Sequence, residues 1–595
     1  MQVLAYLFVA LALYVIASRF YGSRLAQTFG IDPKRLTPAA RINDGRDFVP
    51  TRTPVVFGHH FATIAGAMPI IGPTLALVYG YLPVLIWIVF GAIFIGAVHD
   101  FSALFASVRE EGRSVSEIAR KAMGNTGFTL FIIFTIIMIL LVTSLFLKAT
   151  AVALTSVWPV EKLGLPPDQT LLKTQTDSDG VVLGRVGGIA STSVIIITSI
   201  APLLGYLLYK RNAKVKYVFV LATFVCVFSV FVGFHIPVTL EPTTWMIILT
   251  LYVTVAAGIP VWIILQPRDF TNVQLLYGGL TILLIGLVAG GFSGALSFVA
   301  PASNVAEGVG NIGFVWPMLC ITVACGAISG FHALAAGGTT SKQVCDERAV
   351  KNIGYNAMLL ESALAVGVVL ALASSLNFSD YKAIVWPAIE GQKANPILAF
   401  SLAVGHLLNS ALHLPTVVGT IFGILMVEGF VVTTLDSAVR INRYLFEELW
   451  SIVLKNPPKI MRSYWFNSGL AAALMFVMAY YNAFVTNALV FGSANQLLAA
   501  LTLFSIAVWF MNYGKVAWMV ILPGIFMMFT TIASLLILPE LLIRKHAYML
   551  LVMDIALLGL SIGVIYVAAK TFREKWREIK RAEAGIVPEF LETKR

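Results

Sequence analysis

Histidine and aspartate side chains inside apolar stretches are the first candidates for chemistry in this sequence. They are His59, His60, His99, Asp100 and His332. Ionisable groups are costly in lipid and usually face a cavity or a charged partner. Imidazole carries protons near neutral pH, and it also binds zinc, copper or nickel. The set could therefore relay protons or hold a metal, and its structural alternative is a group of capping or hydrogen-bonded histidines.

Hydroxyl and carboxyl groups further along the chain extend this set. Thr339 and Thr340 could supply oxygen ligands to a hard cation, and a helix-terminal glycine turn explains them equally well. Glu361 and Glu428 lie in apolar runs, where a pair with arginine or a backbone hydrogen bond is the structural alternative. The candidates for coupling to a proton or sodium gradient are His60, Asp100, His332, Thr339, Thr340 and Glu361, and those for a bound metal such as zinc are His59, His60, Asp100 and His332.

The composition is typical of a polytopic membrane protein. Of the 595 residues, 58% are hydrophobic and 12% are charged, about half the ~25% found in soluble domains. The mean hydropathy is +0.86. The net charge of +11 falls in short clusters between apolar runs, which is typical of cytoplasmic loops and argues against nucleic-acid binding. We therefore expect an all-α protein whose surroundings are the lipid bilayer.

Sixteen apolar runs approach the roughly 20 residues that are needed to cross a bilayer. Basic clusters in the early loops mark these loops as cytoplasmic. Loop 436–463 and the C-terminal tail are also basic, and both can be inside only if one run does not cross. The run 395–412 is short, and we expect it to be a re-entrant or surface-lying helix. This predicts about 15 crossings, with the N-terminus outside and the C-terminus cytoplasmic. The runs lie near 1–18, 57–79, 82–106, 127–147, 188–209, 216–234, 244–266, 272–294, 313–336, 355–375, 395–412, 414–435, 464–485, 489–511, 515–537 and 548–569.

Two of these runs contain helix-breaking residues near their middle or end, at Gly66–Pro69 and Gly258–Pro260. Transporters often bind substrate where a membrane helix is broken, because freed backbone groups line a cavity there. The two breaks are five runs apart, so their helices run in opposite directions. This spacing favours a five-plus-five inverted repeat whose breaks face each other, whereas the alternative is that Gly and Pro are simply common in membrane helices. The candidate substrate-binding residues are Ala65, Gly66, Ala67, Met68, Pro69, Gly258, Pro260 and Gln266.

The orientation of the runs also predicts how the ionisable residues meet. The histidines of the second and ninth runs and Asp100 of the third run all fall in the cytoplasmic half of the membrane. In an inverted repeat the second and ninth runs are neighbours. We therefore expect His332 to lie within reach of His59 or His60, with Asp100 close to it. Zinc usually takes four ligands, so this set could hold a metal but does not require one.

The chain divides into four parts. These are a first helix with a basic loop (1–56), a transport core (57–445) with halves near 57–234 and 244–435, further membrane helices (446–569) and a basic tail (570–595). Loop 148–187 is the only long hydrophilic loop expected outside, and it contains turn residues that favour a small cap or hairpin.

Motifs of soluble and membrane enzymes are missing from the sequence. H-E-x-x-H and G-x-S-x-G do not occur, so we do not expect catalysis, and without G-x-x-x-x-G-K-[ST] an ion gradient is favoured over ATP as the energy source. No C-x-x-C occurs, and the cysteines are expected to be inert thiols. Asp436 and Arg440 have the i,i+4 spacing of an ordinary surface pair.

Five motifs resemble one known family, the carbon starvation protein A family of bacterial inner-membrane transporters. They are GHHFATIAGAMPIIGP at 58–73, GAVHDF at 96–101, WIILQPRDF at 262–270, ACGAISGFHALAAGGTTSKQ at 324–343 and TTLDSAVRINR at 433–443. The resemblance implies a multi-pass protein of the bacterial inner membrane that takes up peptides. It also implies the inverted-repeat fold of the amino acid–polyamine–organocation superfamily. Some relatives take up pyruvate by proton symport, so a small-carboxylate symporter is one alternative. A metal-ion transporter and a channel are others.

Overall fold

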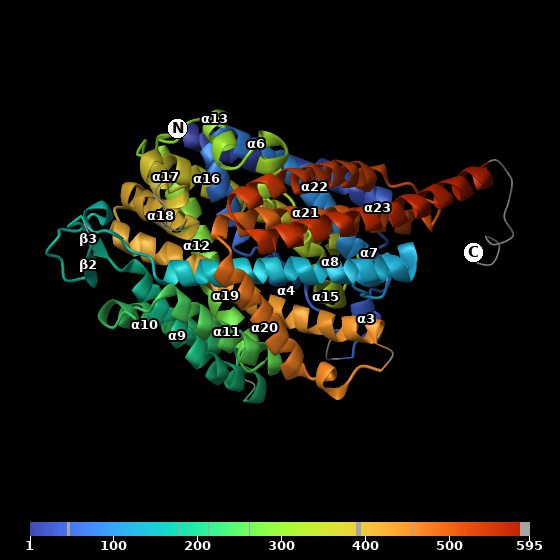
Figure 1. Ribbon diagram of the computed structural model, residues 1–595, viewed down its shortest axis with the longest axis horizontal. Coiled ribbons are helices and arrows are strands. Elements are labelled where there is room, and N and C mark those ends of the chain that lie inside the picture. Colours follow the sequence, from blue (N-terminus) through green and yellow to red (C-terminus); the bar gives the residue numbers. More distant parts are fainter. Residues whose placement is uncertain are drawn as a thin grey trace.

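The structure is a computed structural model that describes residues 1–44, 48–177, 179–211, 213–260, 262–387, 394–454 and 456–583. Each of the sixteen apolar runs is mainly helical, so the all-α prediction is confirmed. Ser178, Lys455 and the last twelve residues of the basic tail lie outside the described residues. The longest helices run along the long axis of the molecule, with the strands β2 and β3 at one end and the C-terminal end of α23 at the other (Figure 1).

Eleven helical segments of the described chain are long and apolar enough to cross a membrane, and two bent helix pairs bring the number to thirteen. The predicted fifteen crossings also count α11 and α20, which fall outside this group, so fifteen stays a prediction. The N-terminal half contains α1 (Gln2–Ala17), η1 (Ser18–Gly22), α2 (Ser23–Phe29), α3 (Pro38–Ile42), α4 (Thr53–Ile64), α5 (Met68–Ala76), η2 (Leu77–Tyr79), α6 (Tyr81–Gly91), η3 (Ala92–Gly96), α7 (Ala97–Arg109), α8 (Val115–Leu154), η4 (Glu161–Leu163), α9 (Val186–Gly205), η5 (Tyr206–Lys210), α10 (Val215–His235), α11 (Pro242–Gly258) and α12 (Leu265–Phe292).

The C-terminal half is also helical, and it contains shorter pieces between its long helices. These elements are α13 (Val305–Asn311), η6 (Val315–Leu319), α14 (Cys320–Thr322), α15 (Phe331–Gly338), η7 (Thr340–Lys342), η8 (Lys351–Asn356), α16 (Ala357–Ser375), α17 (Phe378–Val385), α18 (Pro396–Leu412), α19 (Thr416–Val453), η9 (Lys459–Arg462), α20 (Tyr464–Tyr481), α21 (Phe484–Met511), α22 (Trp518–Arg544) and α23 (Tyr548–Glu583).

The first predicted break is present between α4 and α5, which bend by 46° across residues 65–67. The sequence explains why the helix restarts where it does. Pro69 stands at the start of α5, where its fixed φ favours a first helical turn and its missing N–H costs no hydrogen bond. The break therefore leaves backbone groups without partners in a helix, as expected near Gly66–Pro69.

The second predicted break also interrupts the helices, because α11 ends at Gly258 and α12 begins at Leu265. It is not the break that faces the first one, and this expectation needs correction. The partner of α4 and α5 is a helix interrupted at residues 323–330: α5 packs against α14, and α4 packs against α15. The two broken helices therefore run in opposite directions and cross at their breaks.

Small residues make this crossing possible. A Cβ on Gly72 would lie 2.6 Å from the carbonyl oxygen of Thr322, so the two backbones are in direct contact there. Gly330 has the same role beside α21, where a Cβ would lie 2.4 Å from the carbonyl oxygen of Asn495. The run 323–330 carries neither proline nor a charged residue, which is why its interruption was less visible in the sequence than that of Gly258–Pro260. The five-plus-five repeat stays a prediction.

The contact at Gly72 gives a test of the crossing. Gly72→Ala should lower the free energy of unfolding by about 1–3 kcal/mol, because the added methyl group overpacks the α5–α14 contact. Thermal unfolding in detergent measures the effect. Gly278→Ala in α12 is the matched control, since a Cβ there meets nothing within 4 Å among the described residues, and it should be neutral or slightly stabilising. An unchanged melting temperature in Gly72→Ala would contradict the crossing.

Helix α18 corresponds to the run that was expected not to cross. Twelve of its 17 residues are buried, and it packs against α19 and α16, so it is not a surface-lying helix. It starts beside the end of α8, where Asn395 Nδ2 donates to Ser156 Oγ at 2.8 Å. At about 25 Å its length falls short of the roughly 30 Å hydrocarbon core. A re-entrant helix fits these facts, and that part of the expectation stays a prediction.

The long loop after α8 forms a small antiparallel sheet, as its turn residues predicted. The strands β1 (Trp158–Pro159), β2 (Thr174–Thr176) and β3 (Val182–Gly184) have the order β1-β3-β2. The sheet sits at the end of the molecule opposite the C-terminal end of α23 (Figure 1).

Candidate functional site

Asp100 lies between two histidines in the interior of the protein. Its Oδ2 is 2.7 Å from Nδ1 of His332, and its Oδ1 is 2.8 Å from Nδ1 of His99. Because an ionised carboxylate only accepts hydrogen bonds, each Nδ1 donates its proton when Asp100 is charged. All three residues are at most 1% exposed. The structure therefore brings Asp100 and His332 together, as the depth of their runs in the membrane suggested.

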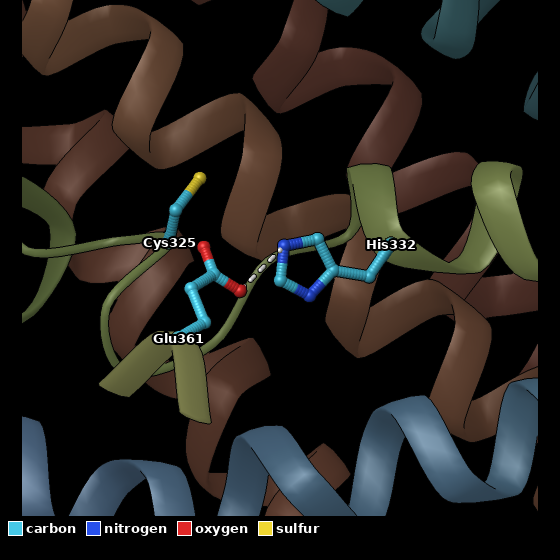
Figure 2. A group of neighbouring side chains, drawn as sticks. All are labelled: Cys325, His332 and Glu361. Carbon is cyan, nitrogen blue, oxygen red and sulfur yellow. Dashed lines mark ion pairs between the residues drawn. The ribbon is translucent and has the colours of Figure 1, made fainter. Parts of the chain in front are cut away.

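His332 continues this chain to a second carboxylate. Its Nε2 lies 3.2 Å from Oε2 of Glu361, whose side chain is fully buried. Figure 2 shows the imidazole ring facing the carboxylate of Glu361, with the thiol of Cys325 close to both. A ring with a carboxylate at each nitrogen can hold a proton between two negative charges and can pass it from one side to the other. We call Asp100, His332 and Glu361 the carboxylate–histidine chain.

The elements that hold this chain meet at the crossing of the two broken helices. Asp100 comes from α7, His332 from the first turn of α15, and Glu361 from α16. Helix α15 restarts directly after the interruption at 323–330, and α16 packs against both α4 and α5. His332 therefore lies in one half of the second broken helix and contacts α16, which packs against both halves of the first.

The other coupling candidates lie around this chain but do not join it directly. His60 Nδ1 is 2.9 Å from Thr340 Oγ1, which connects α4 to η7. Thr339 is exposed, and its hydroxyl donates to the carbonyl oxygen of Ala335. His59 is exposed, while its neighbour His60 is fully buried. Adjacent helical positions point about 100° apart, which explains why only one of the two histidines faces the interior.

Among the described residues, the ligand atoms of the four predicted metal ligands do not form a close group. A different trio is close enough, since Cys325, His332 and Glu361 each offer a ligand atom within 4.8 Å of the others. A thiol, an imidazole and a carboxylate suit zinc, and Asp100 would orient the imidazole from its other nitrogen. Three ligands are one fewer than a closed zinc site uses. Cys325 Sγ is also within hydrogen-bond distance of Ser329 and Asn495, which accounts for the thiol without a metal.

The predicted substrate-binding residues fall into two separate groups. Those from Ala65 to Pro69 form the first break, where a Cβ on Gly66 would lie 3.3 Å from Thr434 Oγ1 of α19. The others are not at the crossing of the two broken helices, which corrects the expected position, while their role in substrate binding stays a prediction. Pro260 and Gln266 are exposed, and Gly258 packs against the ring of Trp465. The glycine and proline of Gly258–Pro260 do interrupt the helices, but they mark the turn between α11 and α12.

A buried ion pair next to this turn was missed. Arg268 Nη1 lies 2.7 Å from Asp436 Oδ2, and both side chains are at most 2% exposed. Tyr252 Oη donates to the same carboxylate oxygen at 2.8 Å. Arg440 was expected to pair with Asp436, but its Nη2 instead donates to the carbonyl oxygens of Ala256 and Ile259 at the end of α11. The signal that could have found the pair is the Arg268–Asp269 dipeptide at the edge of an apolar run.

Comparisons with known proteins identify the family of this chain. The family model "Carbon starvation protein CstA" matches residues 2–394 and 388–534. The peptide transporter CstA of Escherichia coli (strain K12) is 30% identical over 598 residues, covering 88% of this chain and 79% of that protein. The pyruvate/proton symporter BtsT of the same strain is 36% identical over 376 residues, covering 61% of this chain and 48% of that protein.

Solved structures give a weaker likeness. A mutant of the manganese transporter from Eremococcus coleocola is 11% identical and superposes with a TM-score of 0.46 over 90% of this chain and 97% of that one. The assignment therefore depends on the family match and the apolar helices. Together they make this chain a multi-pass membrane transporter, and it belongs to the carbon starvation protein CstA family.

Proposed function

We propose that this protein is a secondary active transporter that imports peptides across the bacterial inner membrane, driven by a proton gradient. The observation that carries the proposal is the buried carboxylate–histidine chain at the crossing of two broken helices. Ionisable groups at membrane depth are costly, and they usually mark an ion or proton pathway.

The carboxylate–histidine chain offers a physical link between protonation of His332 and the packing of the helices around it. With His332 protonated, its ring carries a positive charge between Asp100 and Glu361 and attracts α7 and α16 toward α15. With the ring neutral and both carboxylates ionised, the ring can donate at only one nitrogen, so one of the two contacts is lost and the negative charges are no longer compensated. The two protonation states thus favour different packings around the breaks, which is the difference in contacts that an alternating-access step needs.

A proton explains the chemistry of the chain better than sodium does. Hard cations prefer cages of oxygen ligands, whereas here the space between the two carboxylates is occupied by an imidazole ring. The nearby hydroxyl oxygens that could bind a cation are those of Thr339 and Thr340. They are instead hydrogen-bonded to the carbonyl oxygen of Ala335 and to Nδ1 of His60. The matched relative BtsT is a pyruvate/proton symporter, so a carboxylate substrate is the second candidate for the cargo.

Uptake into proteoliposomes tests this proposal. Purified protein should accumulate dipeptides above their external concentration when the interior is more alkaline than the outside. It should not do so under an equal sodium gradient. Pyruvate supplied in place of peptide distinguishes the second candidate, and equilibration without accumulation would indicate a channel.

Metal removal separates proton coupling from the metal alternative. We expect that treatment with a membrane-permeant chelator leaves gradient-driven peptide uptake unchanged, because the carboxylate–histidine chain is complete without an ion. Element analysis of the purified protein is measured in parallel. Loss of uptake on chelation, restored by zinc, would contradict proton coupling through this chain and would favour a site at Cys325, His332 and Glu361.

A further inference from the structure

An open groove of about 550 Å³ lies between α21, α22 and α23, three helices that pack against one another (Figure 1). Its volume is within the range of roughly 300–1,000 Å³ that small-molecule pockets occupy. Its wall is apolar and aromatic except for one arginine, and Phe504 is the contribution of α21. The described residues that line it include none of the coupling or substrate-binding candidates, so the groove is separate from the carboxylate–histidine chain.

The groove has an aliphatic end and an aromatic end. Helices α22 and α23 are joined by a short turn after Arg544 and line the groove side by side, with Met528 and Ile565 at the end nearer this turn. At the other end the rings of Trp518 and Trp576 have their centroids 6.2 Å apart. From Ile565 to Trp576 the groove follows α23 for about 16 Å, at 1.5 Å per residue. This length is about half of the roughly 30 Å hydrocarbon core, which is the share of one leaflet.

The aromatic end carries hydrogen-bond donors without an acceptor in the described part of the chain. Arg573 lines the groove, is exposed, and forms no hydrogen bond or ion pair there. The indole N–H groups of Trp518 and Trp576 likewise donate to none of the described residues. A guanidinium and two indole N–H groups suit the oxygens of a phosphate. The helical neighbours of Arg573 supply no acid in their place, since they are Ala569, Lys570, Trp576 and Arg577.

The charge around this end favours an acidic headgroup over a zwitterionic one. From residue 570 to 580, α23 carries five basic and two acidic residues. Of the two acids, Glu578 is paired with Lys575 at 2.8 Å. Lys580 Nζ lies 5.7 Å from the centroid of the Trp576 ring, which adds a further positive charge close to the groove. An ammonium or choline group placed here would meet this excess of like charge.

We propose that this groove binds one acidic phospholipid, with its phosphate at Arg573 and an acyl chain between α22 and α23. Tryptophan side chains favour the membrane–water interface, so Trp518 and Trp576 mark the depth at which a headgroup lies. The chain then runs along the aliphatic wall into the hydrocarbon core, and the rest of the lipid faces the surrounding bilayer. A lipid without net charge fills the same wall but gains less at Arg573 and its basic neighbours.

Native mass spectrometry of the full-length protein in a neutral detergent tests this proposal. Phosphatidylglycerol and phosphatidylcholine with identical acyl chains are added at equal concentrations, and the lipid retained by each protein molecule is counted. The wild type should retain one phosphatidylglycerol, about tenfold more often than phosphatidylcholine, because hydrogen bonds to a charged group add to the burial of the acyl chain. Arg573→Gln should bring the ratio of the two lipids close to one.

Two further variants separate the groove from the general basic charge of α23. Lys570 is exposed one helical turn before Arg573 and does not line the groove, so Lys570→Gln removes the same charge and should keep most of the preference. Ala569 is exposed and does line the groove. Ala569→Trp should therefore leave the fold intact, fill the groove and abolish retention of both lipids.

Several results would overturn the proposal. The first is a wild type that retains the two lipids equally, and the second is an Arg573→Gln variant with the wild-type preference. Unchanged retention of phosphatidylglycerol in Ala569→Trp would place the lipid on the basic surface of α23 and not in the groove. A dimer that carries no lipid in the same spectra would show that a second copy of this chain covers the groove.

Discussion

Asp100→Asn should reduce proton-driven accumulation of peptide to the level of empty proteoliposomes, while the protein still folds. Asparagine has nearly the same shape and can still accept a hydrogen bond from Nδ1 of His332. It cannot supply the negative charge that stabilises the protonated ring between two carboxylates. Initial rates of uptake under an imposed pH gradient measure this effect.

The control for this substitution is another histidine on a membrane-depth helix. His406 in α18 is half-buried and lies outside the carboxylate–histidine chain, so His406→Gln should keep most of the uptake. Wild-type accumulation by Asp100→Asn would show that the buried carboxylate is a structural partner of its two histidines and does not couple protons.

Breaking the ion pair between Arg268 and Asp436 should have the largest effect on stability. Asp436→Asn leaves the buried guanidinium without its charged partner, which typically costs about 3–5 kcal/mol. Replacing both residues, as in Arg268→Met with Asp436→Leu, should recover much of the lost stability, because the unpaired guanidinium is removed together with its main partner. Thermal unfolding in detergent is the measurement.

An exposed pair provides the comparison for this prediction. Arg544 and Glu540 form an i,i+4 ion pair in α22, and both side chains are more than 70% exposed. Glu540→Gln should leave the melting temperature unchanged, because water and salt screen such pairs. A double variant of Arg268 and Asp436 that is no more stable than Asp436→Asn alone would contradict the assignment of the stability loss to an unpaired charge.

Features that depend on local composition could be predicted from the sequence. The apolar runs, the break at Gly66–Pro69 and the hairpin after α8 all follow from residue types within short windows. The meeting of Asp100 with His332 followed from their depth in the membrane, because topology places residues of equal depth in one layer. The assignment of roles to these residues stays a prediction.

Contacts between distant helices could not be predicted in the same way. The break that faces Gly66 lies at 323–330, and it depends on Gly72 fitting against the backbone of Thr322, a contact between segments 250 residues apart. The glycine and proline of Gly258–Pro260 indicated a broken helix more clearly than residues 323–330 did, but proline and glycine also end helices in ordinary turns. The pair of Arg268 with Asp436 was also missed, because the two residues are 168 positions apart and no local pattern connects them.

Proton entry that accompanies peptide entry measures proton coupling through the carboxylate–histidine chain most directly. Proteoliposomes that contain a pH-sensitive dye are given alanyl-alanine outside, without an imposed gradient. The wild type should acidify the interior on peptide addition. His332→Gln should show no acidification, yet it should still exchange labelled for unlabelled peptide. Acidification by His332→Gln at the wild-type rate would contradict proton coupling through the carboxylate–histidine chain.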